Sequence, residues 1–270
     1  MTLIDAGTIQ LDYERSGNPD GPPLLLIMGM SGTALHWGEP FLELLRPDFD
    51  LIAYDHRGVG SSSRLDGPVT TPQMADDAAG LLGALGIGSA HVMGISMGGM
   101  IAQELALNHR ELIRTLTLGC TYCGGPGSAL AGPEVATKLQ AAMLSGDREQ
   151  AIRAGWEVNV SAAFAAGEEA YASFREIGNR RAVSVEVIMQ QLQACAAHNT
   201  YDRLPQLEGL KTLVIHGTED ELLPVQNGEL IASRIPDSRL EIFEGVGHLF
   251  FWERPERSAE LVRALAAVPA

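Results

Sequence analysis

Short, largely apolar runs recur along the first half of the chain, and each is followed by a segment with helical periodicity. Residues 24–27 (Leu-Leu-Leu-Ile), 51–54 (Leu-Ile-Ala-Tyr) and 90–95 (Ala-His-Val-Met-Gly-Ile) are runs of this kind. Such runs predict strands that are buried on both faces of a parallel sheet. Residues 8–15 alternate between apolar and polar positions, which predicts a half-exposed strand at an edge of that sheet. Strands that alternate with helices at short spacing predict an α/β fold with a mostly parallel sheet.

The same alternation continues to residue 118 and returns at the end of the chain. Further strands are predicted over residues 112–118, 212–215 and 240–243. Helices are predicted over residues 36–45, 71–85, 224–234 and 255–267. A further helix is predicted from the turn after Ser96 to about residue 109. For the second of these helices, Thr71 is the predicted cap and Pro72 the first helical residue.

The pattern changes between residues 123 and 204, where helical periodicity runs on without a strand-like segment. Helices are predicted there over residues 134–144, 149–158, 168–177 and 185–198. We therefore predict an α/β core, made of residues 1–122 and 205–270, with helices on both faces of its sheet. Residues 123–204 are predicted to form an inserted helical cap.

One serine lies where the strand predicted at residues 90–95 meets the next helix. The local sequence is Gly94-Ile95-Ser96-Met97-Gly98. Glycines on both sides of a serine leave room for neighbouring backbone in a sharp strand-to-helix turn, which lifts the hydroxyl out of the sheet. The helix begins directly after Ser96, so its unpaired N–H groups and its dipole lie next to the hydroxyl. This arrangement predicts that Ser96 is a nucleophile that attacks a carbonyl.

A serine hydroxyl needs a base, and the base needs an acid that orients it. His248 follows the last predicted strand in a glycine-rich loop, where a parallel sheet presents its functional residues. Asp220 follows the preceding strand and is the predicted acid, with Glu219 and Glu221 as the alternatives. The order serine, acid, histidine along the chain is that of the nucleophile-elbow hydrolases.

The negative charge that develops on the attacked carbonyl needs two backbone N–H donors. Met97, directly after the nucleophile, is predicted to supply one donor, and Met30, in the loop after residues 24–27, the other. The wall of the substrate site is expected to be apolar and to accept a moderately bulky acyl or alcohol group. The residues assigned to that wall are Gly29, Trp37, Trp156, Phe164, Met189 and Phe250.

The amino-acid composition limits the classes of molecule that the protein is expected to bind. Of 270 residues, 34 are Asp or Glu and 19 are Lys or Arg, which gives a formal net charge of −15. This acidity argues against nucleic acids and anionic membranes as partners. We expect a small-molecule substrate, a monomer or homodimer, and no cofactor or metal. Three cysteines are too few and odd in number for a disulfide framework. We also expect no secretory signal and no membrane span. These expectations together predict a cytoplasmic protein.

Four ordered motifs carry a resemblance to a known family. They are residues 54–62 (Tyr-Asp-His-Arg-Gly-Val-Gly-Ser-Ser), 94–99 (Gly-Ile-Ser-Met-Gly-Gly), 216–220 (His-Gly-Thr-Glu-Asp) and 245–248 (Gly-Val-Gly-His). Together they resemble the α/β-hydrolase superfamily, especially small bacterial esterases, enol-lactonases, haloperoxidase-like enzymes and methylesterases of the aclacinomycin type. The resemblance implies an eight-stranded sheet, whose second strand is missing from the strands assigned above, and a helical cap over the active site. This chain has Met28-Gly29 where the family usually has His-Gly; because the donor is backbone, we expect the oxyanion hole to be kept.

The leading functional hypothesis is hydrolysis of a carboxylic ester or lactone through an acyl-enzyme, with Ser96, His248 and Asp220 as the triad. A serine nucleophile disfavours the dehalogenases and epoxide hydrolases of this fold, which use aspartate at the same turn. One alternative is a carbon–carbon bond hydrolase of a vinylogous diketone, a class that shares the Ser-Met-Gly-Gly sequence. Another is a non-enzymatic receptor or regulator, because a fold does not fix a function.

Overall fold

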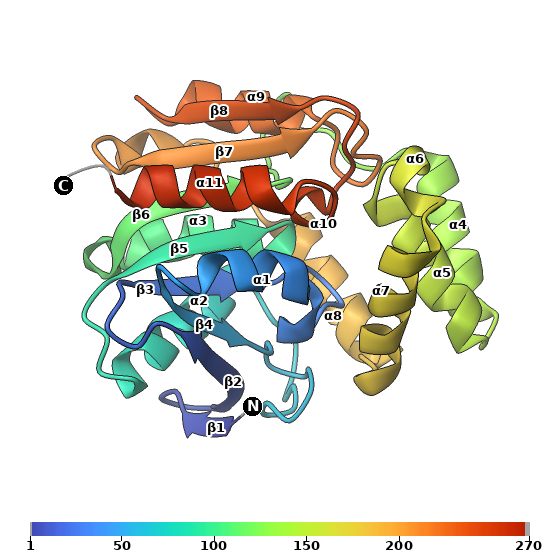
Figure 1. The fold of residues 1–270 in the computed structure, drawn as a ribbon, viewed down its shortest axis with the longest axis horizontal. Coiled ribbons are helices and arrows are strands. Elements are labelled where there is room, and N and C mark those ends of the chain that lie inside the picture. Colours follow the sequence, from blue (N-terminus) through green and yellow to red (C-terminus); the bar gives the residue numbers. More distant parts are fainter. Residues whose placement is uncertain (1, 268–270) are drawn as a thin grey trace.

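The computed structural model describes residues 2–267, which form an eight-stranded sheet in the order β1-β2-β4-β3-β5-β6-β7-β8 (Figure 1). The strands are β1 (Thr2–Asp5), β2 (Gln10–Gly17), β3 (Pro23–Ile27), β4 (Asp50–Tyr54), β5 (Ala90–Ile95), β6 (Ile113–Gly119), β7 (Thr212–Gly217) and β8 (Arg239–Phe243). Neighbours are antiparallel at the β1–β2–β4 edge and parallel from β4 to β8. The predicted fold class is confirmed.

The strand that the hydropathy pattern missed is β1, the first strand of the sheet and not the second. It pairs with β2 as an antiparallel edge, with Thr2 opposite Tyr13. Only Ile4 of its four residues is partly buried, and the others are exposed. An edge strand this short has almost no buried face, so its sequence carries no alternation that would reveal it.

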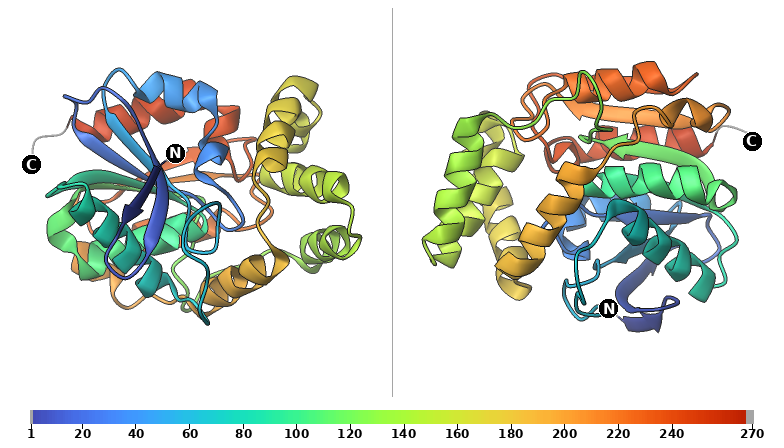
Figure 2. Two further views of the ribbon diagram at one scale, coloured as in Figure 1. Left: turned by 90° about the horizontal axis from the view of Figure 1, so that it is seen from below. Right: turned by 180° about the vertical axis from the view of Figure 1, so that it is seen from behind.

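Helices cover both faces of the sheet, as Figures 1 and 2 show. One face carries α1 (Glu39–Leu45), α10 (Phe250–Glu253) and α11 (Pro255–Ala266), and the other carries α2 (Thr71–Ala84), α3 (Met97–Asn108) and α9 (Gln226–Arg234). The predicted helix over residues 36–45 is divided at Gly38, whose φ of 73° interrupts it after a 3₁₀ turn. The cap of α2 is Thr70 and not Thr71, because the Thr70 hydroxyl accepts the Gln73 N–H. The short helix α10 was not predicted.

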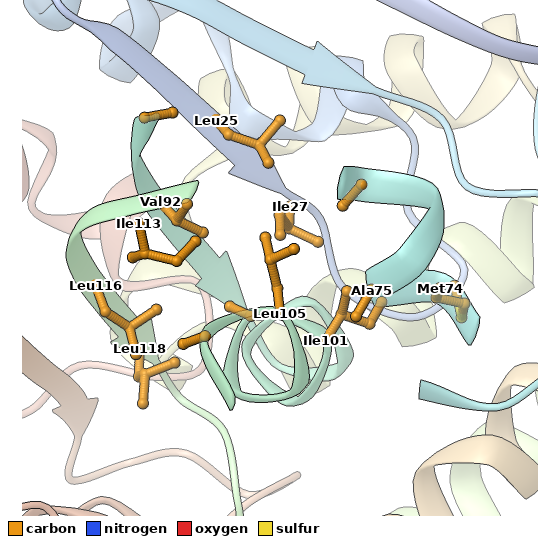
Figure 3. Packing of buried hydrophobic residues seen from close by; sticks show 14 of the residues in the cluster. Leu25, Ile27, Met74, Ala75, Val92, Ile101, Leu105, Ile113, Leu116 and Leu118 are labelled. Atoms are coloured by element: carbon orange, nitrogen blue, oxygen red, sulfur yellow. The ribbon is translucent and has the colours of Figure 1, made fainter. Parts of the chain in front are cut away.

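The central strand β3 shows how the two faces share the core. Leu25 and Ile27 pack toward α2 and α3, whereas Leu24 and Leu26 pack toward α1 and α11. Figure 3 shows the first of these clusters, in which Leu25 and Ile27 lie with side chains of β5, β6, α2 and α3. All four side chains are buried, which explains why no polar residue interrupts the run. This packing fixes the carboxyl end of β3, where a loop important for the site begins.

The stretch predicted as a cap contains helices and no strand among its described residues. The helices are α4 (Pro133–Leu144), α5 (Arg148–Asn159), α6 (Ala162–Ala165), α7 (Glu168–Arg180) and α8 (Val185–Ala197). Figure 1 shows α4 to α7 as a group toward which the arrowheads of β5 and β7 point, while α8 lies nearer the sheet. These helices therefore lie at the carboxyl edge of the parallel strands. Within residues 2–267, no helix combines the length and apolarity that crossing a membrane requires.

Candidate active site

Ser96 lies on a strained turn between β5 and α3. Its φ of 57° and ψ of −123° are rare for a residue with a side chain. A Cβ at Gly94 would come within 2.2 Å of the Gly98 carbonyl oxygen, and one at Gly98 would come within 1.9 Å of the Ile27 oxygen. Both obstacles are backbone atoms that cannot turn aside. The two glycines are thus required by close approach of the chain, and the turn holds Ser96 at the carboxyl edge of the sheet.

Asp220 and His248 form a buried pair beside this turn. Nδ1 of His248 donates to Oδ2 of Asp220 at 2.7 Å, which leaves Nε2 of His248 to accept a proton. The other oxygen of Asp220 accepts the N–H groups of Leu222 and Leu223 at 3.0 and 2.9 Å. His216 approaches Oδ2 at 3.2 Å while donating to the Leu223 carbonyl. Burial alone would raise the pKa of Asp220, but the neighbouring His248 and His216 outweigh it and hold the pKa below its usual range.

Hydrogen bonds link the loop that carries His248 to the cap. The buried carboxylate of Glu253 accepts the N–H groups of Gly247 and of Ser161, each at 2.8 Å. The Asn159 carbonyl, at the end of α5, accepts the Leu249 N–H at 2.7 Å. Sequence reasoning missed Glu253, because nothing in a lone glutamate before a helix reveals that it binds backbone N–H groups of two separate segments.

The loop after β3 lies directly beside Ser96. A Cβ at Gly29 would stand 3.1 Å from the Ser96 Cβ and 3.7 Å from its hydroxyl oxygen, so Gly29 permits this approach. Nε2 of buried His56 donates to the Met28 carbonyl at 2.8 Å, and burial lowers the pKa of His56 to about 4 despite that bond. A neutral His56 therefore holds the loop in place. The N–H groups of Met30 and Met97 donate to no other described group, which suits the two predicted oxyanion donors.

A cavity of about 350 Å³ opens between this edge of the sheet and the cap. Ser96, His248 and Gly29 line it together with Met30, so the structure brings the predicted chemistry to one place. The cap contributes one residue of α4, one face of α5, parts of α7 and α8, and the segment between α7 and α8. These lining residues are Leu139, Arg148, Ala151, Ile152, Gly155, Val158, Asn159, Phe174, Gly178, Arg181, Ala182, Val183 and Ile188.

Five of the six predicted wall residues do not line this cavity, which corrects that part of the prediction. Trp37 is inaccessible and packs against the ring of Phe251, with centroids 4.8 Å apart. Trp156 and Phe164 belong to an aromatic cluster inside the cap, Phe250 packs in the core, and Met189 is 44% exposed on α8. The apolar character of these side chains predicted burial but did not show what each of them covers. The spacing of Ala151, Gly155 and Val158 would have been the better signal, since these small side chains leave room.

His36 also lines the cavity, and sequence reasoning gave it no role. Its Nδ1 accepts the Thr33 N–H at 3.0 Å, so the ring proton must be on Nε2. Burial lowers the pKa of His36 to about 4, although the bond from Thr33 opposes this. His36 is therefore a neutral hydrogen-bond donor in the cavity wall.

Cys120, His216 and Asp220 bring three metal-ligating atoms within 4.8 Å of one another behind the pair. The chemistry of this set does not fit a metal. Burial raises the pKa of the Cys120 thiol well above its usual value, so the thiol keeps its proton. The ring nitrogen of His216 that faces Asp220 already donates to Leu223. The cluster is better described as support for Asp220.

Comparison with known proteins gives consistent matches along the whole chain. A family model described as the alpha/beta hydrolase fold matches residues 22–255. The chain is 30% identical to a putative carbamate hydrolase, RutD, of Azorhizobium caulinodans, over 97% of each chain. It is 28% identical to 3-oxoadipate enol-lactonase 2 of Acinetobacter baylyi, over 97% of this chain and 95% of that one. A solved esterase of Thermogutta terrifontis, with malate bound, superimposes with a TM-score of 0.76 at 28% identity, covering 97% and 96% of the two chains.

Proposed function

This chain belongs to the α/β-hydrolase fold family, and we propose that it is a serine hydrolase that cleaves a carboxylic ester or lactone through an acyl-enzyme. One observation carries the proposal. A strained serine and a histidine with its Nε2 free to accept a proton line the same cavity, and a buried carboxylate orients that histidine. The enol-lactonase and esterase named above support the class of bond.

In the proposed mechanism each residue has a defined step. The Ser96 hydroxyl attacks the carbonyl carbon while Nε2 of His248 takes the hydroxyl proton. Asp220 stabilises the resulting imidazolium, and the N–H groups of Met30 and Met97 donate to the oxyanion. His248 then gives its proton to the departing alkoxide, leaving an acyl group on Ser96. Water attacks that ester while His248 takes a proton from it. As the second oxyanion collapses, the acid is released and His248 returns the proton to the Ser96 oxygen.

Substitution of the nucleophile tests this proposal. Ser96→Ala is expected to lower kcat for p-nitrophenyl butyrate by about 10³-fold or more, because the acyl-enzyme cannot form. Its far-UV circular dichroism should match that of the unchanged protein. Ser173→Ala, on the exposed side of α7, is the matched control and should keep full activity. Substantial turnover by Ser96→Ala would refute the assignment.

A substrate panel and a covalent probe separate the alternatives. An alkyl fluorophosphonate should add one phosphonyl group to Ser96, seen by mass spectrometry; a receptor on this fold without a working triad would remain unmodified. Esters and lactones are expected to be turned over far faster than a ring-cleavage diketone, the substrate of the carbon–carbon hydrolase alternative. A phenyl carbamate belongs in the same panel because of the carbamate hydrolase relative.

A further inference from the structure

The two charged side chains that line the cavity, apart from histidines, are both arginines. They are Arg148, at the start of α5, and Arg181, after α7. The described lining contains no aspartate or glutamate, although the whole chain has a net charge of −15. The question is then whether either arginine has a charge that is free to bind a ligand.

Arg181 is already neutralised. It forms ion pairs with Asp12, at 2.8 Å, and with Asp55, and both carboxylates are almost fully buried. One guanidinium thus faces two negative charges. Its charge serves the protein and is not free for a ligand.

Arg148 is held in place but its charge is not balanced. Its Nη2 donates to the carbonyls of Gly178 and Asn179, near the end of α7, at 2.6 and 3.1 Å. These partners are neutral, and among residues 2–267 no carboxylate pairs with Arg148. The remaining N–H groups of the fork are available to an acceptor in the cavity.

An apolar strip separates this cation from the catalytic groups. Ala151, Ile152, Gly155 and Val158 follow Arg148 along the cavity face of α5. The strip ends at Asn159, whose carbonyl is bonded to the residue after His248. At 1.5 Å per residue, α5 places its two ends about 16 Å apart. Arg148 and the His248 loop therefore lie toward opposite ends of the cavity face of α5, with apolar side chains between them.

We propose that Arg148 binds a carboxylate at the far end of the substrate. The substrate class is then an ester or lactone in which an apolar chain separates the reacting carbonyl from a second, ionised carboxyl group. A planar guanidinium with free N–H groups matches a carboxylate in geometry as well as charge. This inference rests on the proposed function for the identity of the reacting bond, but not for the binding of the anion.

Calorimetric binding to the Ser96→Ala protein tests the inference without requiring turnover. The ligands are monomethyl esters of straight-chain dicarboxylic acids of four to ten carbons, and the neutral methyl esters of monocarboxylic acids of equal length. Arg148→Gln, added to Ser96→Ala, should weaken binding of the best anionic ligand by about fivefold or more. Binding of its neutral counterpart should change by less than twofold. The anionic preference should also shrink in 0.5 M NaCl, because the site is exposed.

Arg180→Gln is the matched control, since it removes the same charge from the neighbouring exposed end of α7 outside the cavity. Arg148→Lys should keep part of the preference, because the charge remains without the fork. The inference would be overturned if Arg148→Gln and Arg180→Gln lowered the affinity for the anionic ligand equally. It would also be overturned if Arg148→Gln lowered the affinity for the anionic and neutral ligands equally, or if no ester binding were detectable. If Ser96→Ala instead keeps its esterase activity while Arg148 discriminates as expected, the proposed nucleophile fails and the anion site stands.

Discussion

At the scale of single residues, Asp220 controls which nitrogen of His248 carries the proton. Its Oδ1 is occupied by two backbone N–H groups, so only Oδ2 can face the histidines. In Asp220→Asn the amide oxygen would keep the backbone bonds and the NH₂ group would face Nδ1 of His248. That nitrogen would then have to accept, which moves the ring proton to Nε2, where it blocks proton transfer from Ser96.

We expect Asp220→Asn to lower kcat for p-nitrophenyl butyrate at pH 7 by about 10³-fold or more, by the tautomer effect known for catalytic triads. Glu219→Gln and Glu221→Gln are the matched controls, because these neighbours were the alternative acids, and each should keep activity within about twofold. A strong loss in either control, with activity kept in Asp220→Asn, would move the acid to another residue.

The same residues show what a sequence can reveal. Ser96, Asp220 and His248 each follow a strand of the parallel part of the sheet, and parallel strands bring their carboxyl ends to one edge, so a linear pattern predicts the meeting. Trp37 and Trp156 could not be placed in this way. Their apolar character predicts burial but does not distinguish a core from a cavity wall, which depends on how the helices of the cap are oriented.

At the scale of elements, the chain segment between α7 and α8 is attached to the core by Arg181. This arginine pairs with Asp12 of β2 and with Asp55, directly after β4. Asp55 also accepts the Ala34 N–H at 2.8 Å, just beyond the loop that carries Met30. This link could not be predicted from the sequence, because its members lie up to 169 residues apart. The helices themselves were predictable, since amphipathic periodicity is local.

Arg181→Met should destabilise the protein by about 3–5 kcal/mol at pH 7.5, because two buried carboxylates lose their partner. Burial already raises the pKa of Asp55 even with Arg181 present, and loss of the cation should raise it further. The deficit should therefore diminish toward pH 5, where Asp55 in the folded variant takes up a proton that it releases on unfolding. Urea unfolding at both pH values measures this. Arg180→Met, the exposed neighbour, should cost less than about 0.5 kcal/mol, and an equal loss there would contradict the assignment.

At the scale of the whole molecule, three buried histidines and the half-buried His36 couple folding stability to pH. His36, His56, His91 and His198 each have a pKa lowered to about 4, with burial as the main cause. In the unfolded chain they bind protons below about pH 6.5, whereas the folded protein binds them only near pH 4. The contribution of these neutral histidines to the free energy of unfolding is therefore fully present above pH 6.5, and it is lost as the pH falls toward 4. Asp55 and Asp77, with raised pKa values, act in the opposite direction at the acid end of this range.

Each histidine should change the free energy of unfolding by up to about 1.4 kcal/mol per pH unit. Four histidines therefore give a steep loss of stability between pH 7 and pH 5. His198 is buried between Thr71 and Thr200, away from the Asp220–His248 pair, and glutamine can keep polar contacts there. His198→Gln should reduce the slope of unfolding free energy against pH by about one proton, and adding His91→Gln should remove about one more. Urea titrations at half-unit intervals of pH give these slopes directly. If the double variant kept the full slope, protonation of His91 and His198 on unfolding would not be a source of the acid sensitivity.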